Sequence, residues 1–531
     1  MGGENTDGQR SGKVLDIKDK NINDLGRVHF IGIGGAGMSV LAEILLQKGI
    51  SVSGSDREKN EKTDRLEQLG AVVFEGQKAE NVEGADTVVR SSAIKRDNPE
   101  IVKAESMGIR ILHRSDILAL LLSERKAITV AGAHGKTTVS AMISHILREK
   151  GKGSLRDPGY AIGGTLRIGN GKACGGHAGS GEAMVAEADE SDGSFLKYSP
   201  FLAVVTNIEP DHLDFYGSAE KFEEAFAVHM SNASGHIVAC ADDGGVLSVL
   251  KTLKKEQLER TVVYAAGSSG VSGAEDLAVG GIVRIKPVSS AGLESASAGD
   301  TSVNEAENAV EKFSLVFPSS AVFGEENRGK VLHVTISVPG MHNIRNATAA
   351  ICAAVLAGMK PEDAAEAISD FEGVSRRFEK IGSAAGIEVY DDYGHHPSEV
   401  AAALEAARRR FPGRTLRVIF QPHLFSRTYY FASEFAKALS IADDVVVTGI
   451  YPAREKQRDW PQVNADTIVN AANKLNISNC SICSAETETE AADMIVSRSK
   501  KGDAIMTIGA GSVGKIAPYI VSCLSSKTDK S

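Results

Sequence analysis

The stretch AITVAGAHGKTT, residues 127–138, joins a short apolar run to a glycine-rich turn. Apolar side chains then recur at helical spacing, at Val139, Met142, Ile143, Ile146 and Leu147. This order of strand, glycine turn and helix predicts a phosphate-binding loop, because backbone N–H groups at the start of a helix attract anions. The residues of this loop predicted to bind ATP are Gly132, Ala133, His134, Gly135, Lys136, Thr137 and Thr138.

The side chains of the loop suit a nucleoside triphosphate with magnesium. We expect the Lys136 ammonium group on the β and γ phosphates and the Thr137 hydroxyl on the metal ion. The spacing GxxGKTT is two residues shorter than the common GxxxxGK[ST] pattern. Two acidic segments, 187–192 (EADESD) and 209–214 (EPDHLD), each follow a strand-like run. Because open α/β sheets bind ligands at the carboxyl ends of their strands, these segments predict a magnesium site.

A second glycine-rich turn, GIGGAG at residues 32–37, follows the apolar run RVHFI. It fits the pattern GxGxxG between a strand and a helix, and Asp56 closes the next strand about 20 residues further on. The pattern predicts a pyrophosphate cradle. Taken alone, it also fits an NAD-dependent dehydrogenase, or a tight turn that binds nothing.

The chain is long enough for several domains. At 531 residues, and with about 150 residues per domain, roughly three are expected. Strand-like and helix-like patterns alternate throughout, which predicts α/β domains. We expect a disordered tail at 1–25, domains at 26–122, 123–373 and 374–524, and mobile loops or insertions at 151–181 and 267–308.

Composition excludes several classes of function. The net charge of −10 and the pI near 5.8 give no basic surface for nucleic acid, so no nucleic-acid partner is expected. The polar N-terminus and the absence of a long apolar run predict a cytoplasmic protein without membrane insertion. The six cysteines are scattered. Cys480 and Cys483 form a CxxC without a second pair, so reduced thiols are expected.

Eight motifs occur in a fixed order along nearly the whole chain: HFIGIGGAGMS, AGAHGKTT, EADESDGSFL, TNIEPDHLDFYG, PGMHNIRNATAA, GVSRRFEKIG, DDYGHHPSEV and FQPHLFSRT. In this set and order the sequence resembles the Mur ligases of bacterial cell-wall synthesis, and within them the alanine-adding branch. The resemblance implies an N-terminal Rossmann-like UDP-binding domain, a central P-loop ATPase-like domain and a C-terminal Rossmann-like domain. It also favours the diphosphate of a UDP-sugar over NAD at the first glycine turn.

The resemblance further implies which residues bind the nucleotides. Those facing the UDP-sugar would be Gly32, Gly34, Gly35, Ala36, Gly37, Met38, Asp56, Ser91, Ser92, His113 and Arg114. Asn343 and Asn346 would approach adenine, although the pair could instead be a helix N-cap with an amide neighbour. Arg377 and Asp392 would close onto the nucleotide from the C-terminal domain.

The same resemblance implies the reaction. The lactyl carboxylate of UDP-N-acetylmuramate would attack the γ-phosphorus of ATP, and the amine of L-alanine would then displace phosphate from the acyl phosphate. The amino acid would face His395, His423 and Arg427, and Mg²⁺ or Mn²⁺ would bind Thr137, Glu187 and His212. Because imidazole titrates near neutral pH, His395 is the candidate proton acceptor. The implied catalytic set is Lys136, Glu187, His212, Arg377, Asp392 and His395. A monomer or weak homodimer is expected.

Some residues depart from the family pattern, and other functions stay open. Leu424 stands where many relatives have arginine, so one cation near the carboxylates is missing or replaced. Arg454 and the segment 511–513 also depart, which weakens the amino-acid assignment. The alternatives are a sister ligase that adds another amino acid or recycles a peptide, a folylpolyglutamate-type ligase, and a non-enzymatic nucleotide sensor.

Overall fold

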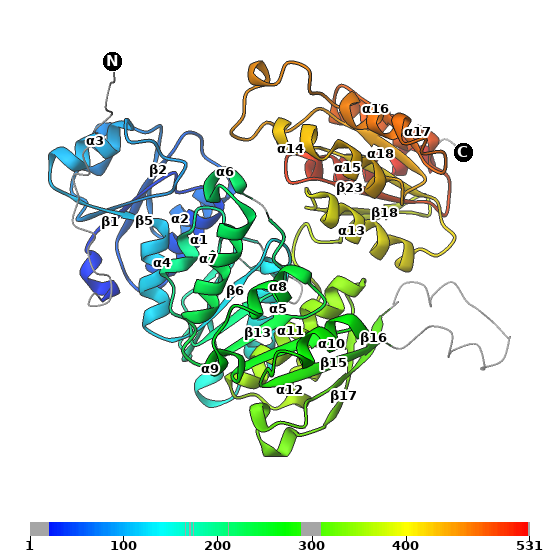
Figure 1. The fold of residues 1–531 in the computed structure, drawn as a ribbon. Helices are drawn as coiled ribbons and strands as arrows, with labels where there is room; N and C mark the ends of the chain where they lie inside the picture. Colours follow the sequence, from blue (N-terminus) through cyan, green and yellow to red (C-terminus); the bar gives the residue numbers. More distant parts are fainter. Residues whose placement is uncertain are drawn as a thin grey trace, which may run out of the picture.

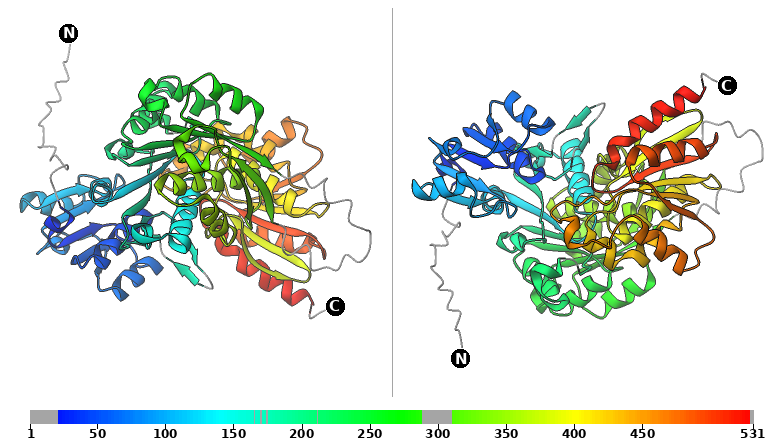
Figure 2. Two further views of the ribbon diagram at one scale, coloured as in Figure 1. Left: turned by 90° about the horizontal axis from the view of Figure 1, so that it is seen from below. Right: turned by 90° about the horizontal axis from the view of Figure 1, so that it is seen from above.

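The computed structural model describes residues 21–164, 166–168, 171–173, 175–210, 212–287 and 310–528. Within these ranges, three large sheets flanked by helices define an N-terminal, a central and a C-terminal domain (Figure 1). The two views of Figure 2 show the N-terminal and C-terminal domains at opposite ends, with the central domain between them. The predicted α/β fold class is confirmed.

The N-terminal domain is a five-stranded parallel sheet in the order β3-β2-β1-β4-β5. Its strands are β1 (Val28–Ile31), β2 (Val52–Asp56), β3 (Val72–Glu75), β4 (Thr87–Arg90) and β5 (Arg110–His113). Its helices are α1 (Ala36–Gln47), α2 (Glu61–Gln68), α3 (Pro99–Ser106) and α4 (Arg114–Ser123). Because β1 lies at the centre of the sheet, the glycine turn at its carboxyl end faces the crevice where such sheets bind ligands.

The central domain has a ten-stranded sheet in the order β10-β7-β11-β6-β12-β13-β14-β15-β16-β17. The strands are β6 (Lys126–Ala131), β7 (Gly159–Ala161), β10 (Gly176–His177), β11 (Ala183–Glu187), β12 (Leu202–Val205), β13 (His236–Cys240), β14 (Thr261–Ala265), β15 (Gly281–Pro287), β16 (Glu311–Val316) and β17 (Val331–Ile336). Neighbouring strands from β7 to β15 pair in parallel, and the edges are antiparallel. The phosphate-binding loop therefore follows a strand near the middle of the sheet.

Helices cover both faces of this sheet. One face packs against α5 (Lys136–Lys150), α11 (Met341–Ala357) and α12 (Pro361–Ser369). The other packs against α7 (Ala219–Ser231) and α8 (Gly244–Leu250), and its apolar side chains continue without a break into α1 and α4 of the N-terminal domain. The two domains share a core, so we expect them to move together, with a hinge near Gly373 rather than near Ser123.

Two stretches that were predicted to be mobile loops or insertions contain regular elements, so the loop interpretation of them was wrong. The stretch 151–181, predicted to be a mobile loop or insertion, contains β7 and β10 of the central sheet as well as the small hairpin of β8 (Leu166–Ile168) and β9 (Gly171–Ala173). The first part of the stretch 267–308 forms α10 (Ser268–Glu275) and β15, and residues 288–309 lie outside the described residues. In both stretches the elements are short, and their Gly-rich and Ser-rich composition is typical of loops.

The C-terminal domain has a six-stranded sheet in the order β18-β19-β23-β20-β21-β22. Its strands are β18 (Glu379–Ala384), β19 (Ile387–Asp392), β20 (Leu416–Phe420), β21 (Asp444–Val447), β22 (Ser481–Ser484) and β23 (Ala504–Ile508). Its helices are α13 (Pro397–Arg410), α14 (Phe425–Tyr430), α15 (Ala432–Leu439), α16 (Asp466–Lys474), α17 (Glu488–Arg498) and α18 (Ala517–Thr528). Its apolar clusters are separate from those of the other domains. Across the described residues, none of the helices has the length and apolar character needed to cross a membrane.

Candidate active site

Two glycines shape the phosphate-binding loop between β6 and α5. Gly132 has a φ of 136° and Gly135 a φ of 85°, values that residues with a side chain rarely adopt. A Cβ atom on Gly132 would also lie 2.2 Å from Thr206 Oγ1. The loop thus requires glycine at these positions, and it presents the N-terminus of α5, where an anion is favoured.

Lys136 is the first residue of α5 and points back into its own loop. Its ammonium group donates hydrogen bonds to Gly132 O at 2.6 Å and to Glu190 Oε1 at 2.9 Å. Burial by itself lowers the pKa of Lys136, but the adjacent Glu190 carboxylate outweighs burial, and the net shift is upward. The side chain is therefore a positively charged group held in the place where phosphate oxygens would bind.

Two carboxylates next to this ammonium group are suited to a cation. Burial raises the pKa of Glu187, which accepts hydrogen bonds from Gly163 N–H at 2.8 Å and from the Thr137 hydroxyl. Glu190 Oε2 is buried without a hydrogen-bond partner among the described residues. A half-buried carboxylate beside a hydroxyl is a hard oxygen donor set of the kind that Mg²⁺ prefers.

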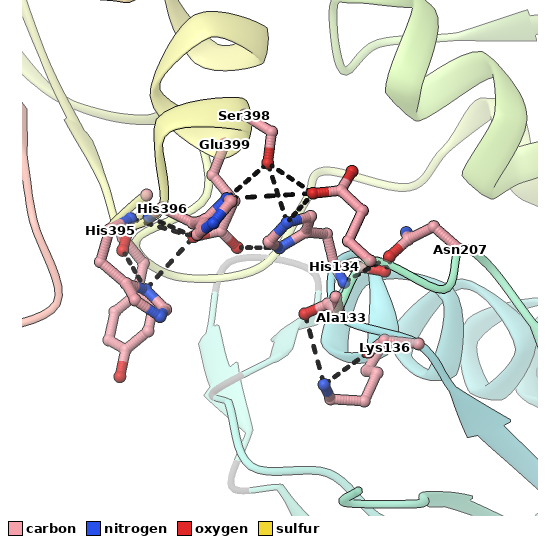
Figure 3. Close-up of polar contacts among 12 residues, drawn as sticks. Ala133, His134, Lys136, Asn207, His395, His396, Ser398 and Glu399 are labelled. Carbon is pink, nitrogen blue, oxygen red and sulfur yellow. Dashed lines mark hydrogen bonds and ion pairs between the residues drawn. The ribbon is translucent and has the colours of Figure 1, made fainter. Parts of the chain in front are cut away.

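A polar network joins the loop to the C-terminal domain. His134 Nδ1 lies 3.2 Å from Glu399 Oε1, and its Nε2 lies 2.9 Å from Ser398 Oγ and 3.4 Å from Glu209 Oε2. His396 Nδ1 lies 2.8 Å from the same Ser398 hydroxyl. Figure 3 shows His134, His396, Ser398 and Glu399 meeting between α13 and the phosphate-binding loop. The contact sets the C-terminal domain directly over the loop.

The network is ionic. Burial by itself lowers the pKa of His134, but hydrogen bonds to Glu209 and Glu399 raise it from 6.5 to about 9. Burial by itself raises the pKa of Glu399, but His395, His134 and Arg377 hold it well below its ordinary value. His134 is therefore protonated and Glu399 ionised near neutral pH, and each stabilises the charge of the other.

Alkaline pH is expected to weaken this contact. The pKa of His134 is raised from 6.5 to about 9 in the folded protein. The stabilisation of the folded state by protonated His134 is therefore complete below pH 6.5, and it is lost as the pH rises through about 9. Melting curves at about pH 6.5 and about pH 9.5 test this. The wild type should lose about 5 °C more than His134→Gln, which lacks the titrating group. Equal losses in the two proteins would contradict the expectation.

A cavity of about 270 Å³ opens beside the network. It is lined by the phosphate-binding loop, by α11 and by residues of the C-terminal domain, and Asn343 and Asn346 lie on its wall. The N-cap interpretation of these asparagines was wrong, because Gly340 is the N-cap of α11 and both lie within the helix. Asn346 Nδ2 instead donates to Asn343 Oδ1 at 3.3 Å, which joins the two amides at the cavity wall.

Arg377 and Asp392 line the same cavity from the opposite domain. Arg377 Nη1 donates to Glu399 Oε1 at 3.3 Å. Asp392 accepts hydrogen bonds from the N–H groups of Phe378 and Gly394, each at 2.8 Å. Burial raises the pKa of Asp392 to about 6 against the influence of Arg377. The hydrogen bonds to Glu399, Phe378 and Gly394 hold both side chains in place on the C-terminal domain.

The three residues predicted for the amino acid lie together at the carboxyl ends of β19 and β20. The rings of His395 and His423 have centroids 5.6 Å apart, and Arg427 Nη1 lies 3.3 Å from His423 Nδ1. Burial is the main cause that lowers the pKa of both imidazoles to about 4. His423 Nδ1 therefore accepts a hydrogen bond from the guanidinium group, and both histidines are neutral near neutral pH.

Comparison with known proteins identifies this arrangement. Three family models match in order: "Mur ligase family, catalytic domain" at residues 27–126, "Mur ligase middle domain" at 130–354, and "Mur ligase, glutamate ligase domain" at 376–511. The chain belongs to the Mur ligase family. The three matched regions correspond to the three sheets, so the cavity of this Mur ligase lies between its middle and C-terminal domains.

Relatives of known name cover almost the whole chain. A protein of Bifidobacterium adolescentis named UDP-N-acetylmuramate–L-alanine ligase is 51% identical over 95% of this chain and 94% of its own. One of the same name from Renibacterium salmoninarum is 43% identical over 95% of this chain and 97% of its own. The solved UDP-N-acetylmuramate-alanine ligase of Thermotoga maritima superimposes with a TM-score of 0.71 at 27% identity, covering 94% of this chain and 99% of the other.

The first glycine turn of this Mur ligase is closed by its own acidic residue. Gly32 has a φ of 79°, and Gly34 N–H donates to Asp56 Oδ2 at 2.8 Å. A Cβ atom on Gly34 would lie 2.5 Å from Asn60 Nδ2. Glycine at positions 32 and 34 therefore keeps this part of the turn free of side chains, as a close approach of the backbone to a pyrophosphate requires.

Residues predicted to line the UDP-sugar path also bridge two domains. Arg114 Nη2 lies 2.6 Å from Asp189 Oδ2, and Ser92 Oγ donates to Asp192 Oδ2 at 2.5 Å. His113 Nε2 lies 3.1 Å from Ser92 Oγ. The bonds of Arg114 and Ser92 join the N-terminal domain to the acidic segment after β11, and the contact of His113 supports the bond of Ser92. These contacts connect the N-terminal domain with the acidic segment that also contains Glu190, the partner of Lys136.

His212 lies at the start of the turn that forms α6 (Leu213–Tyr216), with a φ of 54°. The same turn brings the Tyr216 hydroxyl onto Glu190 O. The turn therefore lies beside the partner of Lys136. The metal-binding role of His212 stays a prediction.

Sequence reasoning assigned no role to Glu399, Ser398 or His396, and it gave Glu209 only a place in the acidic segment predicted to lie at a magnesium site. Glu399 contacts the loop histidine, Arg377 and the His395 N–H group, although its local sequence is that of an ordinary helix start after proline. The only available signal was its place in the motif DDYGHHPSEV. The partners lie far apart in sequence, since Ser398 and His134 are separated by 264 residues.

Proposed function

We propose that this Mur ligase joins L-alanine to the carboxylate of UDP-N-acetylmuramate with ATP, during the synthesis of peptidoglycan precursors. The observation that carries the proposal is the 51% identity, over 95% of the chain, with a protein of that name. The site supports it, because an anion-binding loop with a partly buried ammonium group lies beside the interdomain cavity, and His395 of the cluster with His423 and Arg427 is hydrogen-bonded to Glu399 of the cavity wall. We take the cytoplasm as its location.

The chemistry follows from charge. A carboxylate repels an incoming amine and must first be activated, here as an acyl phosphate formed by attack on the γ-phosphorus of ATP. Lys136 would neutralise the phosphate oxygens, and the N-terminus of α5 would orient them. Thr137 and Glu187, with His212, would hold Mg²⁺, which supplies further charge neutralisation at the phosphates. Asn343 and Asn346 would contact the base, and Arg377 and Asp392 the nucleotide from above.

The second step requires a free amine. His395 lies next to His423 and Arg427, and with a pKa of about 4 it is neutral near neutral pH, so it can accept a proton. Such a low pKa makes it a weak base. A bound anion next to the ring would raise the pKa, so we propose that His395 becomes an effective acceptor only when the acyl phosphate is present.

The proposal is tested by measuring phosphate release from the purified protein against a panel of amino acids and UDP-sugars. We expect release only when ATP, magnesium, UDP-N-acetylmuramate and L-alanine are all present. Strong release with another amino acid, or with a peptide as acceptor, would assign the chain to a sister ligase. Nucleotide binding without any acceptor-dependent release would instead support a nucleotide sensor.

A further inference from the structure

The loop that follows β21 is fixed against the amino-acid cluster at two points. Tyr451 stacks on His423 with ring centroids 5.8 Å apart, and its carbonyl accepts a hydrogen bond from Leu424 N–H at 2.9 Å. Four residues later, Glu455 accepts hydrogen bonds from the N–H group of Ser426 at 3.0 Å and from its hydroxyl at 2.5 Å. The backbone between these two points is therefore held beside His423 and α14.

Arg454 lies between the two fixed points. Its side chain is exposed, and no described residue forms a hydrogen bond or ion pair with its guanidinium group. Burial is the main cause that lowers the pKa of His423, and the charges of His395, Arg427 and Arg454 contribute in that order. Arg427 reaches the same ring from α14. One guanidinium group thus contacts His423 from α14, and the backbone that carries a second one is held beside the same ring by Tyr451 and Glu455.

Position 424 cannot supply a cation to this cluster. Leu424 is only 7% exposed, and its backbone has a φ of 70° immediately before α14. In the motif FQPHLFSRT, Leu424 stands where many relatives have arginine, so that one cation near the carboxylates is missing or replaced. Arg454 carries the positive charge that Leu424 lacks, and the loop that contains it is anchored to His423, Leu424 and Ser426.

We propose that Arg454 binds the α-carboxylate of the incoming amino acid together with Arg427, and so replaces the cation that position 424 does not provide. The proposal rests on the ligase function proposed above. A guanidinium group pairs with a carboxylate through two parallel N–H···O bonds, and Arg454 has no competing partner among the described residues. Because the amine and carboxylate of an α-amino acid share one carbon, a carboxylate held there leaves the amine near His395.

The test is the steady-state kinetics of Arg454→Gln in the full-length enzyme. We expect the KM for L-alanine to rise about 10-fold to 100-fold, as for the loss of a charge-assisted hydrogen bond, while kcat and the KM values for ATP and UDP-N-acetylmuramate stay within about twofold. Arg454→Lys keeps the positive charge but cannot form two parallel N–H···O bonds, so its KM for L-alanine should be intermediate. The matched control is Arg458→Gln, which removes an exposed arginine of the same loop whose partner is Asp459.

Other results would overturn the proposal. An unchanged KM for L-alanine in Arg454→Gln, or a parallel rise in the KM for ATP, would mean that Arg454 does not bind the amino acid. If the wild type releases phosphate with a different amino acid only, the proposed function fails by itself. The KM for that amino acid then becomes the quantity that tests Arg454.

Discussion

Replacing Lys136 with alanine is expected to lower turnover by about three orders of magnitude or more. The ammonium group is held by Gly132 O and Glu190 Oε1 at the N-terminus of α5, and the other cation of the loop, protonated His134, is already paired with Glu399 and Glu209. Removing it also leaves Glu190 buried without its partner, which repels phosphate oxygens. The measurement is ADP release at saturating L-alanine and UDP-N-acetylmuramate.

The control for Lys136→Ala is Lys152→Ala, because Lys152 is an exposed lysine shortly after the end of the same helix and pairs only with Asp363 among the described residues. Binding of the UDP-sugar, followed by calorimetry, should survive in Lys136→Ala, since that ligand is assigned to the N-terminal domain. Near-normal ADP release by this variant would mean that the loop of residues 132–138 is not the ATP site.

Replacing Glu399 with glutamine is expected to lower kcat/KM by about 100-fold to 1,000-fold. The carboxylate is 7% exposed in its side chain and lies next to His134, Arg377 and His395. Loss of one partner from a buried ion pair costs about 3–5 kcal/mol, because the remaining charges stay desolvated. The amide has nearly the same shape, so the effect reports charge rather than volume.

Two measurements separate this prediction from simple unfolding. Glu405→Gln changes an exposed glutamate of the same helix α13 and should behave as the wild type. Small-angle scattering of Glu399→Gln with an ATP analogue should show a larger radius of gyration than the wild type, since the C-terminal domain has its own core and is held over the loop by polar contacts. An equally compact variant with full activity would contradict the role of Glu399.

Several elements of the fold could be predicted because their signals are local. The phosphate-binding loop was recognisable because Gly132 and Gly135 adopt φ values of 136° and 85° between a buried strand and an amphipathic helix. The turn of residues 32–37 was recognisable for the same reason. Short edge elements were missed instead. The helix α10 reads SSGVSGAE, a composition that favours loops and becomes helical through packing of residues such as Ala274.

Sequence alone determined that this chain has two anion-binding glycine turns, three α/β domains and acidic segments at strand ends, because each depends on residues close together in the chain. Tertiary structure alone decided which side chains meet. Glu399 of α13 contacts the phosphate-binding loop, and Tyr451 of the loop that carries Arg454 stacks on His423, only because strand order and domain placement bring distant segments together. No local periodicity records that geometry, since contacts between distant segments depend on how whole sheets pack.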